Sequence, residues 1–283
     1  MIKIYNSSNI DKTGVTGLWR HSFGDTKEYV EFFLENCPGY LCFTYWEDDR
    51  IVSMFFLLDG ELAGEKSKYL YAACTHSDYR RRGLMENLID AAVSYCTDNG
   101  FSSIFLVPAN EKLYNYYSKF GFTDSFKKKK FKFTVKDIID KNPSVTIEVS
   151  DIVRQKKRLL KSVDGFTFND DVMAYTVKEH INNGGRIYSC SDSDGEMLAF
   201  YYYDKDSCVV KELLTDFCDI NGAVYKHFHD NNIENVYILT PIVYNSKDIL
   251  GEYTRCGMVL PLNNSLKNYL QMHSELYASM YLD

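Results

Sequence analysis

Apolar side chains recur at helical spacing in three stretches of the first half of the chain, residues 26–36, 84–98 and 111–120. Asp25 stands three residues before Glu28, a spacing typical of a capping box at a helix start. Asn99-Gly100 follows the second stretch and Gly121 the third, as expected for helix ends. The repeating positions are Tyr29, Phe32 and Phe33 in the first stretch, Leu84, Leu88, Ala91, Ala92 and Tyr95 in the second, and Leu113, Tyr117 and Phe120 in the third.

Other segments of the first half are rich in β-branched and aromatic residues. "YLCFTYWEDDRIVSMFFLL" contains two such runs joined by an acidic turn, which predicts a hairpin. "KYLYAACT" and "SSIFLVP" predict two further strands. The resulting order is a helix, an antiparallel meander and then β-α-β-α-β, so we expect an α/β (α+β) fold with a mixed sheet.

Length, composition and charge restrict the possible functions. The chain has 283 residues, 45% of them hydrophobic and 25% charged, which suits two ordinary globular domains. A net charge of −7 argues against a general nucleic-acid binder. The longest apolar run, near Met54–Leu58, is far shorter than a membrane span, and "MIKIYNSSNIDKTG" lacks an apolar leader core. We therefore expect a cytoplasmic protein that binds neither nucleic acid nor membrane.

The cysteines give no sign of a metal site or a disulfide framework. All eight are scattered without a C-x-x-C pair, and none stands near a histidine at metal-ligand spacing. "HFH" at 227–229 lies inside a helical pattern, where residues two apart diverge. We expect reduced thiols and no metal.

The segment "YRRRGLM" at 79–85 joins a predicted strand to a predicted helix and is strongly basic. Gly83 stands at the helix start, where backbone N–H groups have no intrahelical partner and carry the positive end of the helix dipole. Such a turn binds phosphate or pyrophosphate, and glycine leaves room for its approach. A basic turn that only caps the helix is the alternative.

This turn and its neighbours resemble the GNAT-type N-acetyltransferases, which use acetyl-CoA. The resemblance depends on "ACTHSDYRRRGLM", "FLVPAN" and "YSKFGF". The family motif is Arg or Gln, two residues, Gly, one residue, then Gly or Ala, and it falls here on Arg80, Gly83 and Met85. Met85 departs from this pattern, and Ser77 replaces the usual proline. Because a second domain follows, the chain is most similar to the two-domain Eis-like (enhanced intracellular survival) subgroup.

The resemblance implies where the cofactor lies. The pyrophosphate is expected on the amides from Arg82 to Asn87, and the pantetheine arm between "AACT" and "IFLVP". The amide of Cys74, Thr75 or His76 is expected to donate to the thioester oxygen. Asn110 resembles the family's asparagine that contacts the pantetheine, and a simple N-cap is the alternative. The expected cofactor-binding residues are Cys74, Thr75, His76, Arg80, Arg81, Arg82, Gly83, Leu84, Met85, Asn87 and Asn110.

Tyr117 resembles the family's general acid through its place just before "SKFGF". A phenol with a pKa of about 10 passes a proton to a thiolate with a pKa of about 8.5 with only a modest mismatch. Tyr114 and Tyr116 are close alternatives, and a tyrosine that only packs is another.

The general base is not identified by the sequence. "KYLYAACT" has no carboxylate, so deprotonation runs through water or a residue from elsewhere, with Asp25, Glu28 and the turn Glu47-Asp48-Asp49 as exposed candidates. Lys127–Lys130 is interpreted as the exposed part of a strand hairpin.

The second half repeats the order of motifs in the first. "YLYAACT" corresponds to "CVVKELLT", "SSIFLVP" to "NVYILTP", and "YSKFGF" at 117–122 to "YTRCGM" at 253–258. The counterpart of the arginine turn carries Asp216 and Asp219 and no arginine, so it repels a pyrophosphate. We therefore expect a catalytic GNAT domain over residues 1–142 and a degenerate GNAT-like domain without a cofactor site over 143–283, with Tyr253 keeping the place of Tyr117.

The expected activity is N-acetyl transfer from acetyl-CoA to a primary amine of a small molecule or peptide. A non-catalytic CoA-binding or scaffolding module is one alternative, and transfer of another acyl group, such as succinyl, is a second. The sequence does not define the acceptor or the oligomeric state.

Overall fold

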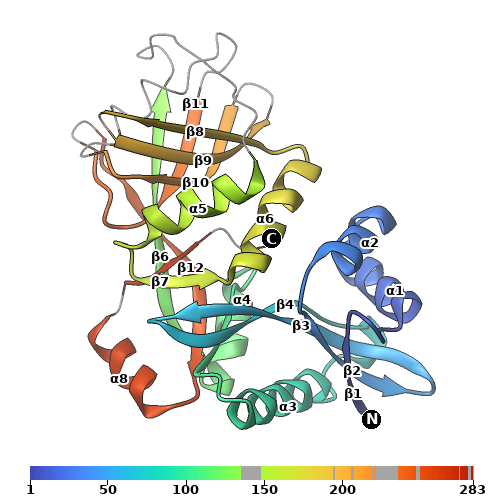
Figure 1. Cartoon of the computed structure of the whole chain (residues 1–283). Coiled ribbons are helices and arrows are strands. Elements are labelled where there is room, and N and C mark those ends of the chain that lie inside the picture. Colours follow the sequence, from blue (N-terminus) through green and yellow to red (C-terminus); the bar gives the residue numbers. More distant parts are fainter. Residues whose placement is uncertain are drawn as a thin grey trace. The chain divides into compact units, whose positions relative to one another are not determined.

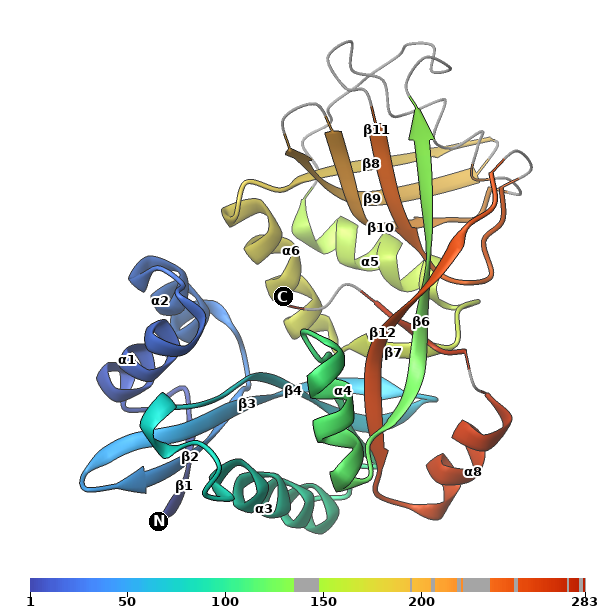
Figure 2. The ribbon, with the colours of Figure 1, turned by 180° about the vertical axis from the view of Figure 1, so that it is seen from behind.

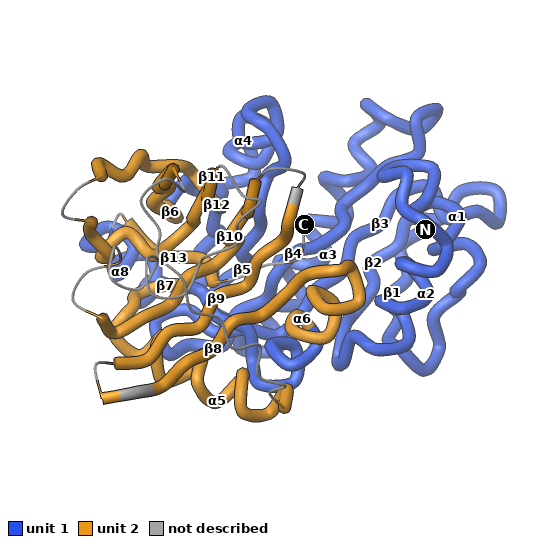
Figure 3. The backbone as a smooth tube through the Cα atoms, turned by 90° about the horizontal axis from the view of Figure 1, so that it is seen from above, with its two compact units in different colours: residues 1–125, 166–175, 257–274 blue, residues 126–165, 176–256, 275–283 orange. Residues whose placement is uncertain are grey.

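The computed structural model forms two compact units, each assembled from three separate stretches of chain (Figure 1 and Figure 3). The structure describes residues 1–134, 148–193, 195–204, 207–217, 220, 235–246, 249–273, 275–279 and 282. Unit 1 contains Met1–Ser125, Phe166–Tyr175 and Gly257–Ser274, and unit 2 contains Phe126–Gly165, Thr176–Cys256 and Glu275–Asp283. The linker expected near residues 140–145 lies outside the described residues.

Unit 1 is built on a mixed sheet that matches the predicted order of strands. Its order is β1(Ile2–Asn6), β2(Leu41–Glu47), β3(Arg50–Leu62), β4(Glu65–Thr75), β5(Ser103–Leu106) and then the second half of β12(Glu252–Pro261). The pairs from β1 to β4 are antiparallel, whereas β4 and β5 run parallel. Strand β7(Gly165–Phe168), which leads into α6(Asp170–Asn182), adds to the far end of β3. The predicted hairpin and the two later strands are confirmed.

Helices cover both faces of this sheet (Figure 1 and Figure 2). On one face, α1(Lys12–Phe23) and α2(Lys27–Asn36) place Trp19 and Phe33 against Phe56 of β3. On the other, α3(Leu84–Asp98) and α4(Glu111–Tyr117) form an apolar core with β3, β4 and β5. A short 3-10 turn, η2(Ser118–Phe120), follows α4, and α8(Asn264–Met272) follows β12. The three predicted helices are confirmed.

The first predicted helix has a different cap from the one expected. Thr26, not Asp25, precedes α2, and its hydroxyl accepts the N–H of Tyr29. Asp25 instead accepts the indole N–H of Trp19 at 2.8 Å. Helix α1 was not predicted, because Gly14, Gly17 and polar residues weaken its apolar periodicity.

Unit 2 repeats the parallel strand pair of unit 1. Its strand order is β6(Thr123–Thr134), β11(Asn235–Thr240), β10(Ser207–Thr215), β9(Gly195–Asp204) and β8(Arg186–Asp192), with β10 and β11 parallel. Helix α5(Val149–Leu160) packs on this sheet through Ile152 and Leu159. The correspondence of β4 with β10, and of β5 with β11, is therefore confirmed.

Two sequence interpretations need correction, and two others concern residues that the structure does not describe. Lys128 and Lys129 lie in β6 and their side chains are buried. The interpretation of Lys127–Lys130 as the exposed part of a hairpin is therefore wrong. Tyr253 lies in strand β12 and is 60% exposed, so it does not keep the helical, buried place of Tyr117. "HFH" at 227–229 and Asp219 lie outside the described residues.

A buried ion pair crosses the interior of unit 2. The Lys156 ammonium on α5 lies 2.7 Å from the Glu212 carboxylate on β10, and both side chains are at most 1% exposed. Tyr277 and Ser279 donate hydrogen bonds to the other oxygen of Glu212. Burial alone would raise the pKa of Glu212, but Lys156, Lys128 and the Tyr277 hydroxyl together bring that pKa below its ordinary value. The pair is therefore ionised and depends on both partners.

Replacing Lys156 with methionine should lower the free energy of unfolding by about 3–5 kcal/mol, because it leaves the Glu212 charge buried without its main partner. Lys12→Met is the matched control, because it removes an exposed ion pair with Glu35 and should cost less than about 1 kcal/mol. Urea unfolding followed by circular dichroism measures both. Equal losses in the two variants would contradict a stabilising role for the buried pair.

Candidate active site

The site begins where strand β4 separates from β5. Their parallel ladder ends at Leu70 and Leu106, although β4 continues to Thr75. At the same point the pairing of β4 with β3 shifts register, and Ala72 adopts a positive φ of 51°. This bulge turns the end of β4 away from β5. A gap therefore opens beside the last residues of the strand.

Hydrogen bonds show which backbone groups of β4 face this gap. The His76 amide donates to Val52 O of β3 at 2.9 Å, and the Ser53 hydroxyl donates to Cys74 O. Alternate residues of a strand point their amides to opposite edges, so the Thr75 amide faces the gap. Thr75 O, on that same edge, accepts a hydrogen bond from Arg80 Nε at 3.1 Å.

Of the three alternative donors to the thioester oxygen, two have amides that point away from the gap. The His76 amide is engaged by β3, and the Cys74 amide points to that same edge. Thr75 alone has the expected orientation.

The basic turn has the backbone geometry of an anion site. After η1(Ser77–Tyr79), Arg81 has φ 63° and Gly83 has φ 72°. Gly83 is the N-cap of α3 and offers no side-chain cap. A Cβ added at Gly83 would meet no atom within 3.9 Å, so the approach is open. The amides of Leu84, Met85 and Glu86 form the first turn.

Asn87 does not belong to this set. Its amide donates to Gly83 O at 3.0 Å, which closes the first helical hydrogen bond, so the expected contact through the Asn87 amide is wrong.

The three arginines of the turn have different roles. Arg80 and Arg81 line the pocket described below. Arg82 instead donates to Asp78 O at 2.9 Å, lies 3.6 Å from the Glu47 carboxylate and covers the Tyr79 ring. Arg82 therefore stabilises the turn. Of the three arginines, Arg80 and Arg81 are the ones placed to make the expected contact with the cofactor.

Helix α4 brings tyrosines to the opposite side of the gap. Tyr117 is buried, and burial raises the pKa of its phenol well above the ordinary value, with smaller contributions from Tyr116 and Cys74. The phenol therefore keeps its proton at neutral pH. Tyr116 also lines the pocket, whereas Tyr114 belongs to the core of unit 1.

Asn110 is the N-cap of α4, and its side-chain oxygen accepts the Leu113 amide at 3.2 Å. It is not among the pocket-lining residues, so the capping role is confirmed and the pantetheine contact stays a prediction.

These elements enclose one pocket of about 570 Å³. The sequence did not identify Ser22 and Phe23 of α1 as pocket residues, nor the side chains of Tyr79 and Glu86 near the turn, because no local motif marks them. The lining residues are Ser22, Phe23, Ala73, Cys74, Thr75, Tyr79, Arg80, Arg81, Gly83, Leu84, Met85, Glu86, Leu113, Tyr116 and Tyr117.

None of the acidic residues expected as general bases lines this pocket. Asp25 is bound to Trp19, and Glu47 pairs with Arg82. Glu28 is exposed, and hydrogen bonds from its own backbone and from Thr26 lower its pKa. Glu86, in the first turn of α3, is the carboxylate that the lining contains.

Within the described residues, no group of three or more potential ligands is arranged to hold a metal ion. Seven of the eight cysteines fall in this part of the chain, and all seven are free thiols. Among these residues, too, no helix has the length and apolar character needed to cross a membrane.

Comparison with known proteins places this pocket in a family. Residues 4–122 match the acetyltransferase (GNAT) family model. No curated protein matches the chain in sequence. The matched segment contains all of the elements that enclose the pocket.

Solved structures share the fold at low sequence identity. A probable N-acyltransferase from Enterococcus faecalis V583 is 11% identical with a TM-score of 0.70, over 93% of this chain and 72% of that one. Eis1 from Mycobacterium abscessus is 9% identical with a TM-score of 0.66, over 93% and 74%. A tandem GNAT protein from the clavulanic acid biosynthesis pathway is 11% identical with a TM-score of 0.52, over 93% and 99%. Residues 4–122 therefore match the acetyltransferase (GNAT) family, and the fold of the chain is similar to those of Eis1 and of a tandem GNAT protein.

Proposed function

We propose that this protein transfers the acetyl group of acetyl-CoA to a primary amine in the pocket at the end of β4. One observation carries the proposal: the open turn at Arg80–Gly83 and the protonated phenol of Tyr117 line the same pocket. The first feature suits a pyrophosphate and the second suits a leaving thiolate. GNAT proteins are acyltransferases, and these two features of the pocket suit the binding of the acyl donor and the protonation of its leaving group.

The residues of the turn fit the phosphates of CoA. Gly83 leaves the approach to the α3 amides open, and the helix dipole favours negative charge there. Arg81 is exposed in a left-handed conformation and adds charge at the pocket, beside Arg80. The Met85 side chain is larger than the family motif allows, but it packs partly into the core of unit 1. The amides of α3 therefore stay accessible despite the larger side chain.

The Thr75 amide and Tyr117 hydroxyl would act on the thioester from opposite sides. The Thr75 N–H, on the open edge of β4, donates to the pantetheine arm and helps to hold the thioester carbonyl. The amine nitrogen forms the new N–C bond as the C–S bond breaks. Tyr117 then protonates the departing sulfur.

Unit 2 repeats this backbone geometry but fills it with its own side chains. Its parallel ladder ends at Val210 and Ile238, and a register shift follows between Val210 and Glu212. Thr215 corresponds to Thr75, and its amide donates to the Tyr244 hydroxyl at 3.0 Å. The group that would hold a pantetheine arm is therefore engaged within the unit.

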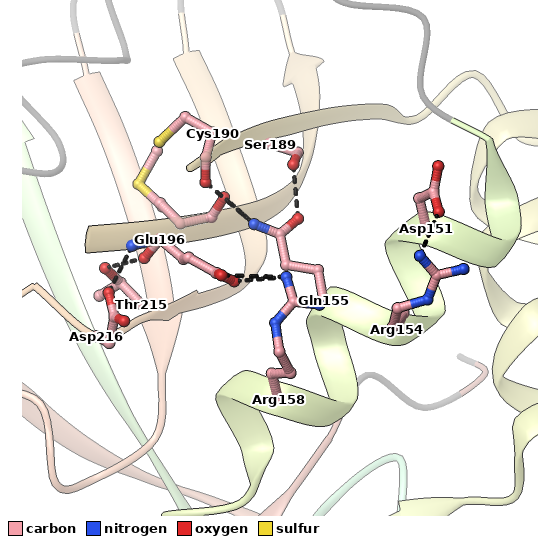
Figure 4. Close-up of polar contacts among 10 residues, drawn as sticks. Asp151, Arg154, Gln155, Arg158, Ser189, Cys190, Glu196, Thr215 and Asp216 are labelled. Atoms are coloured by element: carbon pink, nitrogen blue, oxygen red, sulfur yellow. Dashed lines mark hydrogen bonds and ion pairs between the residues drawn. The ribbon is translucent and has the colours of Figure 1, made fainter. Parts of the chain in front are cut away.

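In unit 2, Asp216, which directly follows β10, takes part in a polar network (Figure 4). The Asp216 carboxylate accepts the Glu196 amide, and Thr215 donates to Glu196 O. Arg158 of α5 binds the Glu196 carboxylate through two hydrogen bonds. These contacts, with the negative charge of Asp216, support our proposal that unit 2 binds no CoA.

Release of free thiol from acetyl-CoA in the presence of a panel of primary amines tests the proposed activity. Binding of acetyl-CoA without thiol release for any amine would favour the non-catalytic CoA-binding or scaffolding module. Faster release from succinyl-CoA than from acetyl-CoA would identify a different acyl donor.

Gly83→Asp should abolish CoA binding, because it places a carboxylate where the pyrophosphate approaches. Gly100→Asp is the matched control: Gly100 has φ 73°, close to the 72° of Gly83, and open space around it, but lies beyond the other end of α3. Backbone strain is therefore similar in the two variants. Calorimetry that finds unchanged affinity for Gly83→Asp would remove the phosphate site.

Tyr117→Phe should lower kcat by at least about tenfold with little change in KM for acetyl-CoA, because general acid catalysis is typically worth about 10²–10⁴-fold. The ring and its packing remain. Tyr114→Phe and Tyr116→Phe are controls, and steady-state kinetics decides among the three. A normal rate for Tyr117→Phe removes the assignment, and a large loss in a control moves it to that tyrosine.

Titration with CoA should give one site per chain, because the Thr215 amide and the Asp216 turn of unit 2 are engaged internally. Isothermal titration measures this stoichiometry directly. Two equivalent sites would show that unit 2 also binds the cofactor.

A further inference from the structure

A pair of stacked imidazoles joins the end of helix α1 to the end of β4, and both of these elements contribute residues to the pocket. His21, in the last turn of α1, and His76, directly after β4, have ring centroids 4.2 Å apart and planes within 7° of parallel. We propose that His21 accepts the proton that the amine substrate loses, and that His76 positions it. This inference rests on the proposed function and supplies the base that the sequence does not identify.

The contacts of α1 with β4 place the pair next to the pocket. Cys74 and His76 point to the same face of β4, because side chains alternate along a strand. Ser22 of α1 and Cys74 of β4 both line the pocket. His21 and His76 stack on each other and join the same two parts of the chain. His21 directly precedes the pocket-lining Ser22, and His76 directly follows the pocket-lining Thr75.

Hydrogen bonds distinguish the two rings. His76 Nδ1 accepts the Asp78 amide at 3.3 Å, so this nitrogen is already used as an acceptor. His21 Nε2 lies 3.3 Å from the Ser77 hydroxyl, which accepts or donates as the proton moves. His21 Nδ1 has no partner in the described part of the chain. His21 is therefore the member of the pair with a nitrogen available for a new proton.

The end of α1 and the His76 ring form the surroundings of His21. The negative end of the α1 dipole lies at His21 and stabilises a cation there. The His76 ring stacks on one face of His21, with the ring centroids 4.2 Å apart. The other groups around the pair are the Asp78 carboxylate at 3.9 Å from His76 Nδ1, the Tyr79 ring, Arg20 beside His21, and Arg80, bound to Thr75 O.

A base at this position fits the proton balance of the reaction. A primary amine is an ammonium ion at neutral pH, since its pKa is about 10. It gives one proton to His21, and the neutral nitrogen attacks the thioester carbon. The second proton lost by nitrogen restores the one that Tyr117 gives to the thiolate. His21 releases its proton to water, so one proton appears for each amide formed.

The test is the pH profile of kcat/KM for acetyl transfer in the full-length protein. His21→Ala should lose at least about tenfold at pH 7, and the deficit should shrink towards pH 9, where more of the amine is already neutral. Added imidazole should restore part of the rate at pH 7. His76→Phe keeps a stacked ring and should retain more of the rate than His76→Ala, which removes the ring.

His273→Ala is the matched control, because that imidazole also stacks on a ring, Tyr269, at 4.1 Å, but lies at the end of α8. It should leave the pH profile unchanged. CoA affinity and thermal unfolding of each variant show whether the fold is intact.

A normal rate for His21→Ala at pH 7 would overturn the inference. So would an equal loss at every pH without rescue by imidazole, because that pattern indicates a structural role. Absence of transfer by the unmodified protein for every amine would remove the proposed function itself, and this inference with it. Transfer by the unmodified protein with an unaffected His21→Ala variant would remove only the inference.

Discussion

The site depends on the separation of two parallel strands. The ladder between β4 and β5 ends at Leu70 and Leu106, and the bulge at Ala72 directs the end of β4 away from its neighbour. A continuous ladder would satisfy the Thr75 amide with a backbone carbonyl and leave no gap for a substrate. The gap instead exposes one strand edge, the first turn of α3 and the tyrosines of α4 to a common space. The geometry of the pocket thus originates in an interruption of regular pairing.

Unit 2 contains a similar interruption of its parallel ladder. The β10 and β11 ladder also ends early and is also followed by a register shift. What differs is the set of side chains around it. The Tyr244 hydroxyl accepts the Thr215 amide, and the Asp216 carboxylate accepts the Glu196 amide. The two units therefore share an early end of the parallel ladder but differ in the side chains that surround it.

The sequence predicted the elements whose signals are local. The helices at 84–98 and 111–120 have strong periodicity and clear end signals, and the basic turn has its glycine at the position where backbone N–H groups are free. Helix α1 was missed because its glycines and polar residues weaken that signal, although it supplies Ser22 and Phe23 to the pocket. The edge to which each β4 amide points could not be predicted either, because it depends on the register of β4 with β3.

Side-chain roles set by distant partners were equally hard to predict. Arg82 resembles its two neighbours in the sequence, yet Glu47, from the β2–β3 hairpin, draws it away from the pocket. Lys128 and Lys129 appear as surface charges in a run of lysines, yet Lys129 reaches Tyr244 O and the Asn245 side chain within unit 2. Each such pair joins residues more than thirty positions apart in the sequence. Local pattern therefore identifies the turn, and long-range contacts decide which of its side chains are available.

The buried position of Tyr117 raises a question about its proton transfer. Burial raises the pKa of its phenol, which makes it a poorer donor to a thiolate of ordinary basicity. The same surroundings, however, raise the pKa of the Cys74 thiol to about 12, because the anion is equally hard to form there. A thiolate that leaves within this pocket experiences the same desolvation and becomes more basic. Burial therefore shifts the pKa of the proposed acid and the pKa of a leaving thiol in the same direction.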